Sequence, residues 1–93
     1  MSCPSFDVTV KDVKAALAKA RKAATDAHGT FSGYDTKGTY KISDDGWISG
    51  KYTIAGSYTV EGKTITITNT ITADKPTVVT CDRVADKIRD WLK

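Results

Sequence analysis

The most regular hydrophobic pattern in the chain is the stretch TITITNTIT, residues 64–72. Threonine occupies every even position, and the odd positions are Ile65, Ile67, Asn69 and Ile71. Alternation with a period of two is typical of a strand with one buried face, so we expect the isoleucines to be buried and the threonines to face water. Rows of threonine bind ice or sugar in some proteins, but the mixed residues of the neighbouring strands favour a solvated face. Asn69 interrupts the apolar row, which predicts that the strand leaves the core or bulges there.

Further short strands are predicted between turn signals. The segment FDVTV at 6–10 alternates in the same way, and residues 30–63 contain apolar runs separated by the turns SDDG and VEGK. Gly62 suits the position of the second turn that needs a positive φ. The segments GTYKI, GKYTI and GSYTV share the form Gly-x-Tyr-x-Ile/Val. We interpret them as consecutive strands of one meander that reuse a pattern.

Two segments carry apolar residues at helical spacing. The first has a stripe that is mostly alanine: Val13, Ala16, Leu17, Ala20, Ala24 and Ala27. Gly29 is expected to end this helix, and His28 beside it to serve in the helix end rather than in catalysis. The second helix follows Pro76, with Thr80 as its N-cap. Its apolar stripe comprises Cys81, Val84, Ala85, Ile88, Trp91 and Leu92.

These elements predict an α+β fold in a single domain, residues 1–93, with the order β-α-β-β-β-β-α. Three or five strands in the middle of the chain are the alternatives to four. An antiparallel sheet with both helices packed on one face is the simplest arrangement that buries all the apolar stripes. The other face of the sheet is then left in contact with water.

The composition excludes several classes of protein. No apolar run approaches the roughly 20 residues of a membrane span, so we expect no transmembrane segment. The N-terminus, MSCPSFDVTV, lacks the basic start and apolar run of a secretory signal, which favours a cytoplasmic location.

The two cysteines, Cys3 and Cys81, form no C-x-x-C motif and lie far from the single His28. We therefore expect no metal site and no cofactor. In a cytoplasmic protein both cysteines are expected to be free thiols, with a disulfide between them as the alternative.

No catalytic set is evident in the sequence. It contains no P-loop, no G-x-S-x-G and no Gly-x-Gly-x-x-Gly, and the adjacent carboxylates of SDDG are typical of a turn. We therefore expect a non-catalytic binding protein rather than an enzyme. The alternative is a small-molecule-binding protein, or an enzyme, with a pocket between the helices and the sheet.

Aromatic residues in the strand region are the first candidates for binding. So small a core leaves little room for every ring, and Trp47 directly follows a turn. We expect Trp47, Tyr52 and Tyr58 to lie on the helix-free face of the sheet, where they would contact a protein partner or form a homodimer.

Basic residues on the first helix are the second candidates. Residues 1–29 carry five Lys or Arg and three Asp, and the cations fall away from the alanine stripe. Lys14, Arg21 and Lys22 are the predicted binding residues of this face. The hypothesis that they bind nucleic acid weakly is kept as an alternative. Nucleic acid is not the expected partner, because the net charge is only +3 and no aromatic residues are interleaved with the cations.

The run from GTFSGYDTKGTYKI to ADKPTVV, followed by a short final helix, resembles the small polyhydroxyalkanoic acid system, or granule-region, protein family. The resemblance is carried by an N-terminal strand with an Ala/Lys-rich helix, by the hairpin GSYTVEGKTITIT, by Lys75 and Pro76, and by the final segment CDRVADKIRDWL. It implies a bacterial protein associated with the surface of polyester storage granules. The family has no established catalytic residues, so the resemblance implies none here.

Overall fold

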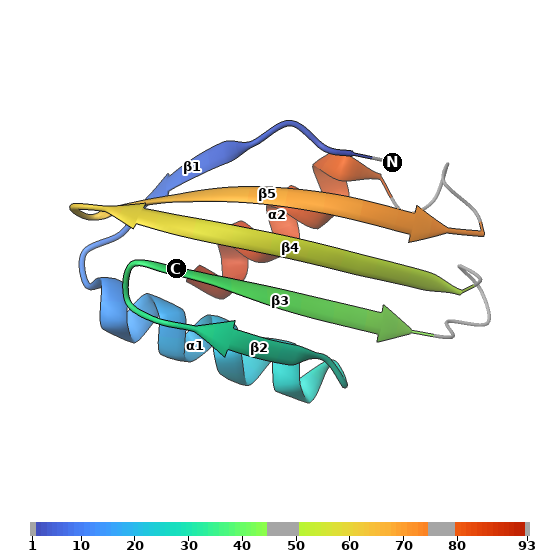
Figure 1. Ribbon diagram of the computed structural model, residues 1–93, viewed down its shortest axis with the longest axis horizontal. Coiled ribbons are helices and arrows are strands. Elements are labelled where there is room, and N and C mark those ends of the chain that lie inside the picture. The colour runs from blue at the N-terminus through green and yellow to red at the C-terminus, as the bar shows by residue number, and fades with distance from the viewer. Residues whose placement is uncertain (1, 45–50, 75–79, 93) are drawn as a thin grey trace.

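The computed structural model describes residues 2–44, 51–74 and 80–92. In this part of the chain the order of elements is β-α-β-β-β-β-α, which confirms the expected α+β class. The elements are β1 (Phe6–Thr9), α1 (Val13–Asp26), β2 (Thr30–Gly33), β3 (Lys37–Asp44), β4 (Tyr52–Glu61), β5 (Thr64–Ala73) and α2 (Cys81–Leu92). The strands form an antiparallel sheet in the order β1-β5-β4-β3-β2, and both helices cover the same face of it (Figure 1). Trp47, Pro76 and part of the SDDG turn lie outside the described residues.

Strand β5 carries the alternation that its sequence predicts. Its three isoleucines are at most 2 % exposed and belong to the core beneath the helices. The threonines point to the other face, where the last three are exposed. Thr64 and Thr66 are half-buried, because β1 pairs beside them and the Thr66 hydroxyl donates a hydrogen bond to the Asp7 carboxylate over 2.8 Å. The water-facing row is therefore partly covered at the β1 end.

Asn69 does not mark a bulge or an exit from the core, so that expectation is wrong. The residue is 1 % exposed, and β5 continues in regular register past it to Ala73. Its side-chain oxygen accepts a hydrogen bond from the hydroxyl of Tyr40 on β3. Gly56 of β4 lies between the two residues in register with both. Asn69 is buried because a phenol from two strands away satisfies its amide oxygen.

The repeated Gly-x-Tyr segments of β3 and β4 interlock across the antiparallel pair. Gly38 is opposite Tyr58, and Tyr40 is opposite Gly56. A Cβ atom at either glycine would overlap the ring of the facing tyrosine. Each ring therefore lies over the backbone of a glycine on the neighbouring strand. The prediction of three consecutive strands is wrong, because the tyrosines of GKYTI and GSYTV both belong to β4, while GTYKI lies on β3. The pairing of β3 with β4 explains the glycines of GTYKI and GSYTV, each of which faces a tyrosine of the other segment.

Both helices begin at residues suited to capping. The Asp12 carboxylate accepts a hydrogen bond from the Ala15 amide over 3.2 Å at the start of α1. At the start of α2, the Thr80 hydroxyl accepts one from the Arg83 amide over 3.3 Å, as the sequence predicts. The buried residues of the two helices fall on the expected stripes: Ala16, Leu17, Ala20 and Ala24 in α1, and Val84, Ile88 and Leu92 in α2.

The C-terminal end of α1 is closed by two hydrogen bonds. The His28 amide donates to the Thr25 carbonyl over 3.0 Å and the Gly29 amide to the Ala24 carbonyl over 2.8 Å, the pattern of a Schellman motif. The residue with positive φ is His28, at 62°, rather than the glycine. Gly29 is needed for a different reason: a Cβ there would lie 2.6 Å from the Lys41 carbonyl oxygen. His28 thus serves in the helix end, as expected, through its backbone.

We expect His28→Gly to raise the free energy of unfolding by about 0.5–1 kcal/mol. The left-handed backbone conformation costs a residue with a Cβ roughly 1–2 kcal/mol, and glycine avoids this cost. Part of the gain is offset because glycine makes the unfolded chain more flexible and so loses more entropy on folding. Urea denaturation monitored by circular dichroism measures the difference. Gly29→Ala is the matched control and should lower stability, because its Cβ meets a carbonyl. A loss of stability in His28→Gly would show that the imidazole makes a stabilising contact of its own.

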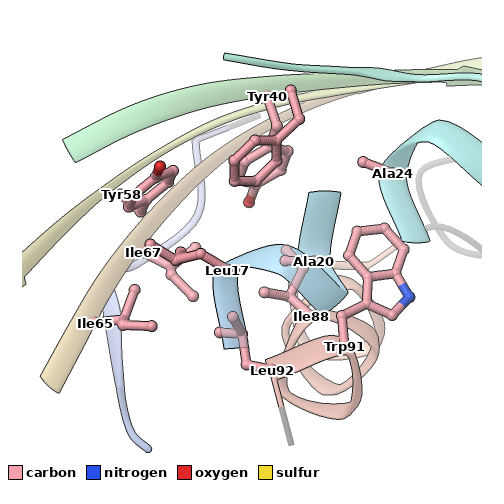
Figure 2. Close-up of a pocket in the computed structure, with 11 residues that line it drawn as sticks. Leu17, Ala20, Ala24, Tyr40, Tyr58, Ile65, Ile67, Ile88, Trp91 and Leu92 are labelled. Carbon is pink, nitrogen blue, oxygen red and sulfur yellow. The ribbon is translucent and has the colours of Figure 1, made fainter. Parts of the chain in front are cut away.

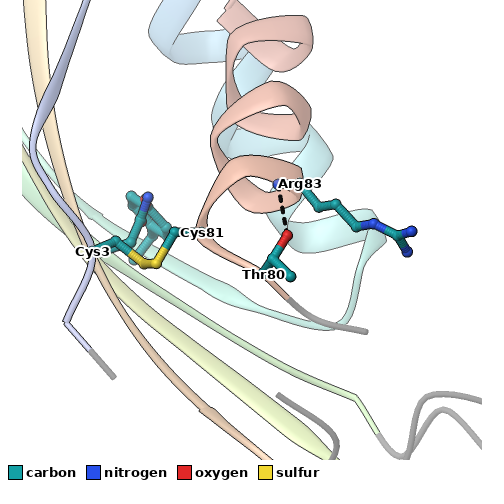
Figure 3. The surroundings of a disulfide bond; sticks show 6 residues. Cys3, Thr80, Cys81 and Arg83 are labelled. Atoms are coloured by element: carbon teal, nitrogen blue, oxygen red, sulfur yellow. Dashed lines mark hydrogen bonds between the residues drawn. A yellow bond between two sulfur atoms is a disulfide. The ribbon is translucent and has the colours of Figure 1, made fainter. Parts of the chain in front are cut away.

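Cys3 and Cys81 form a disulfide, with Cα atoms 5.6 Å apart, so the expectation of free thiols is wrong (Figure 3). The Cys3 amide donates to the Asn69 carbonyl over 2.9 Å, which extends the N-terminal segment along β5. Cys81 begins α2 on the covered face of the sheet. The fold therefore brings together two residues that are 78 positions apart, within the Cα distances that a disulfide requires. An interpretation based on compartment alone could not detect this proximity.

Candidate anion-binding groove

An open groove of about 410 Å³ lies between one flank of α1 and the turn that joins β2 to β3. All three cations predicted from the sequence, Lys14, Arg21 and Lys22, line it from the helix side. Tyr34 and Asp35 of the turn line it from the sheet side. The structure thus brings the three predicted basic residues to one concave surface and adds two residues that the sequence did not single out.

The spacing of the residues on α1 builds the helix side of the groove. Ala18 follows Lys14 by four residues, and Arg21 and Lys22 follow Ala18 by three and four, which places these residues on one flank of the helix. This flank borders the buried stripe at Leu17, which also lines the groove. The small side chain of Ala18 leaves the space between the cations unfilled.

Stacked aromatic rings support the groove from the interior. Phe31 of β2 packs against Tyr58, with ring centroids 5.5 Å apart and planes inclined by 24°. The Arg21 guanidinium carbon lies 5.4 Å from the Phe31 ring centroid, a cation–π contact. Arg21 is therefore positioned by the core of the sheet, although most of its side chain faces solvent.

The β2–β3 turn holds Tyr34 by its backbone. The Tyr34 amide donates to the Lys37 carbonyl over 2.7 Å, and its carbonyl accepts a bond from the Tyr58 hydroxyl over 2.8 Å. The Val60 amide on β4 donates to the Thr36 carbonyl over 2.7 Å and ties the turn to the next strand. The Tyr34 residue is nevertheless 76 % exposed. A fixed backbone thus presents an aromatic side chain to solvent at the rim of the groove.

Positive charge dominates the groove. Three cations face one carboxylate, Asp35, whose oxygen lies 4.0 Å from the Lys14 ammonium. Both side chains of this pair are largely exposed, so the pair is weak and leaves Lys14 available to another anion. Burial raises the pKa of the Tyr58 hydroxyl, while Arg21 lowers it and Asp35 raises it further. The phenol therefore stays protonated and continues to donate to the turn.

Tyr52 and Tyr58 do not lie on the helix-free face, so that part of the expected aromatic surface is wrong. Tyr58 is 4 % exposed and belongs to the core, and Tyr52 is half-buried against it. Both lie an even number of residues from Ile54 on β4 and therefore point to the same face of the sheet as Ile54. Ile54 is opposite the buried Ile71, so this is the face covered by the helices. Tyr58 still lines the groove from within, whereas Tyr52 does not. Trp47 lies outside the described residues, so the homodimer expected through it stays a prediction.

The space between the helices and the sheet is too small for a substrate. Apolar side chains from both helices and the sheet converge on it, including Leu17, Ile65, Ile88 and Trp91 (Figure 2). The cavity measures about 20 Å³, which is room for roughly one water molecule. A ligand site here would require the helices to move apart.

The helix-free face carries a dense set of hydroxyls that bond to one another. Ser5 and Thr68 are 2.7 Å apart, and Ser43 and Thr53 are 3.3 Å apart, each pair bridging neighbouring segments of the sheet. Because these hydroxyls form hydrogen bonds with one another across the strands, we interpret the helix-free face as a water-exposed surface rather than as a ligand-binding site.

Comparison with known proteins gives no match to any family model, to any curated protein or to any solved structure. The granule association implied by the resemblance therefore stays a prediction. Within residues 2–44, 51–74 and 80–92, no helix is long and apolar enough to cross a membrane. The same residues contain no group of three or more His, Cys, Asp or Glu that could hold a metal ion.

Proposed function

We propose that this chain is a small binding protein whose ligand is anionic and lies in the groove between α1 and the β2–β3 turn. The observation that carries the proposal is the convergence of Lys14, Arg21 and Lys22 on one open groove that contains a single opposing carboxylate. The groove falls within the size range of ligand sites, roughly 300–1,000 Å³. No catalytic step is assigned to it.

Arg21 is the cation best suited to hold the ligand. Its guanidinium is always charged and can donate two parallel hydrogen bonds to a carboxylate or phosphate. Its contact with Phe31 restricts the side chain before the ligand arrives, which reduces the entropy lost on binding. Lys14 and Lys22 add exposed point charges that attract an anion without fixing its orientation.

The proposal is tested by titrating the ¹⁵N-labelled protein with inorganic pyrophosphate and following amide chemical shifts. We expect the largest shifts in residues 14–22 and 33–35, with affinity falling as salt increases. The double variant Arg21→Gln/Lys22→Gln should weaken binding about 5–10-fold, because it removes two cations that lie close to the bound anion.

The matched control is Lys41→Gln/Lys63→Gln, which removes the same charge from exposed residues outside the groove. It should leave the affinity within about twofold, since distant surface charges are largely screened. Equal weakening by the two double variants, or shifts centred away from α1 and the turn, would show that the attraction is only a property of the net charge.

Granule association is the second candidate, since the strand, helix and hairpin segments that carry the resemblance adopt the structures expected of them. Co-sedimentation with amorphous polyhydroxybutyrate particles tests it. A cytoplasmic location also stays a prediction. The Cys3–Cys81 disulfide weighs against it, because cytosolic glutathione and thioredoxin keep most protein thiols reduced.

A further inference from the structure

We infer that the ligand of the groove is an aromatic phosphate, with its phosphate on the α1 cations and its planar ring stacked on Tyr34; the free nucleoside monophosphate is the form that fits. This inference rests on the proposed anion-binding function. It adds a second recognition element, the exposed ring beside the charges, and it names the chemical class that would use both.

Tyr34 is the large hydrophobic side chain that stands out as exposed within the described residues. Its ring does not contribute to the core, yet its backbone is held on both sides by hydrogen bonds to Lys37 and Tyr58. A rigid aromatic residue offers contact area at a small entropic cost, as in binding sites that rely on tyrosine. The turn therefore presents the ring in a position suited to stacking.

The distribution of charge orients the ligand. The cations lie on the helix side of the groove, and Asp35 follows Tyr34 on the turn. A phosphate is attracted to Arg21 and Lys22 and repelled by Asp35, so it lies on the helix side. The carboxylate can then accept hydrogen bonds from sugar hydroxyls or an amino group near the ring.

The small size of the groove favours a single nucleotide over single-stranded nucleic acid as the ligand. Proteins that bind single-stranded nucleic acid stack successive bases on several aromatic residues along a charged channel. Here one exposed ring lies beside one cluster of cations, in a groove of about 410 Å³. That volume suits one nucleotide, and the described surface offers no second exposed ring of this size for a neighbouring base.

Isothermal titration with adenosine monophosphate, ribose 5-phosphate and adenosine tests the inference. We expect the monophosphate to bind about 5–150-fold more tightly than ribose 5-phosphate, the range that corresponds to stacking of one base. Tyr34→Ala should abolish that difference, whereas Tyr34→Phe should keep it. Both variants retain the backbone bonds of the turn, and an unchanged melting temperature confirms that they fold.

The outcomes separate the two proposals. If the monophosphate and ribose 5-phosphate bind equally, and both depend on Arg21 and Lys22, stacking on Tyr34 is refuted and the anion groove stands. If no phosphate binds, including pyrophosphate, both proposals fail. A five-nucleotide oligo(dA) that binds more than about tenfold more tightly than the monophosphate would overturn the assignment to a free nucleotide in favour of a strand.

Discussion

Removal of the Cys3–Cys81 disulfide is expected to lower the free energy of unfolding by about 3–4 kcal/mol. The bond joins residues 78 positions apart, and closing a loop of that size in the unfolded chain corresponds to about 4.5 kcal/mol in the chain-entropy description. Measured losses are usually somewhat smaller. Since a chain of this length is stable by roughly 5–14 kcal/mol, the cross-link accounts for a large share of the total.

Guanidinium denaturation of the oxidised protein and of Cys3→Ala/Cys81→Ala measures this effect. Alanine avoids placing a hydroxyl at the buried Cys3 position. The oxidised protein treated with dithiothreitol is the second comparison, because it keeps both sulfur atoms and loses only the bond. A reduced protein as stable as the oxidised one would contradict the expected contribution of the cross-link.

Ile67→Ala is expected to cost about 2–5 kcal/mol, whereas Thr66→Ala should cost well under about 1 kcal/mol. Ile67 is 2 % exposed and borders the cavity between the helices and the sheet, so its truncation enlarges a void that the packed helices cannot readily close. Thr66 loses a single hydrogen bond to Asp7 at the solvated face. Urea denaturation of both variants measures the two losses.

The two positions are adjacent in the chain and lie on opposite faces of β5, so they form a matched pair. The oxidised disulfide must be intact in both proteins for the comparison to hold. Equal losses at Ile67 and Thr66 would show that both faces of the sheet are covered, and would contradict the one-sided arrangement of the helices.

The residues that line the proposed anion-binding groove were predictable from the sequence in part. The flank of α1 that carries Lys14, Arg21 and Lys22 follows from helical spacing. Tyr34 and Asp35 were missed because they lie in a turn, where no periodicity marks them. An aromatic residue inside the turn-rich segment SGYDTKG is the signal that could have identified them, since a ring in a short turn has little core to enter.

The misplaced tyrosines show where an expectation based on size fails. The alternation of β4 already groups Tyr52 and Tyr58 with Ile54, on the covered face. The size of the protein argues for the opposite face, because so small a core offers little room for aromatic rings. For Tyr58 the room comes from glycine, because Gly38 on the neighbouring strand leaves space for its ring, as Gly56 does for Tyr40 of β3. The pairing of each tyrosine with a glycine on the neighbouring strand can be recognised only once the register of β3 and β4 is known.

The local elements of this protein follow from the order of its residues, because strand and helix periodicity and the caps depend on residues a few positions apart. The period-two pattern of β5, the alanine stripe of α1 and the Thr80 cap of α2 are all readable in this way. Which distant groups meet, in contrast, depends on how the strands and helices are arranged in the folded chain. Asn69 is buried because Tyr40 reaches it across β4, and Cys3 pairs with Cys81 because the N-terminal segment runs along β5. Contacts of this kind depend on strand order and register, which join positions tens of residues apart and leave no periodic trace in the chain.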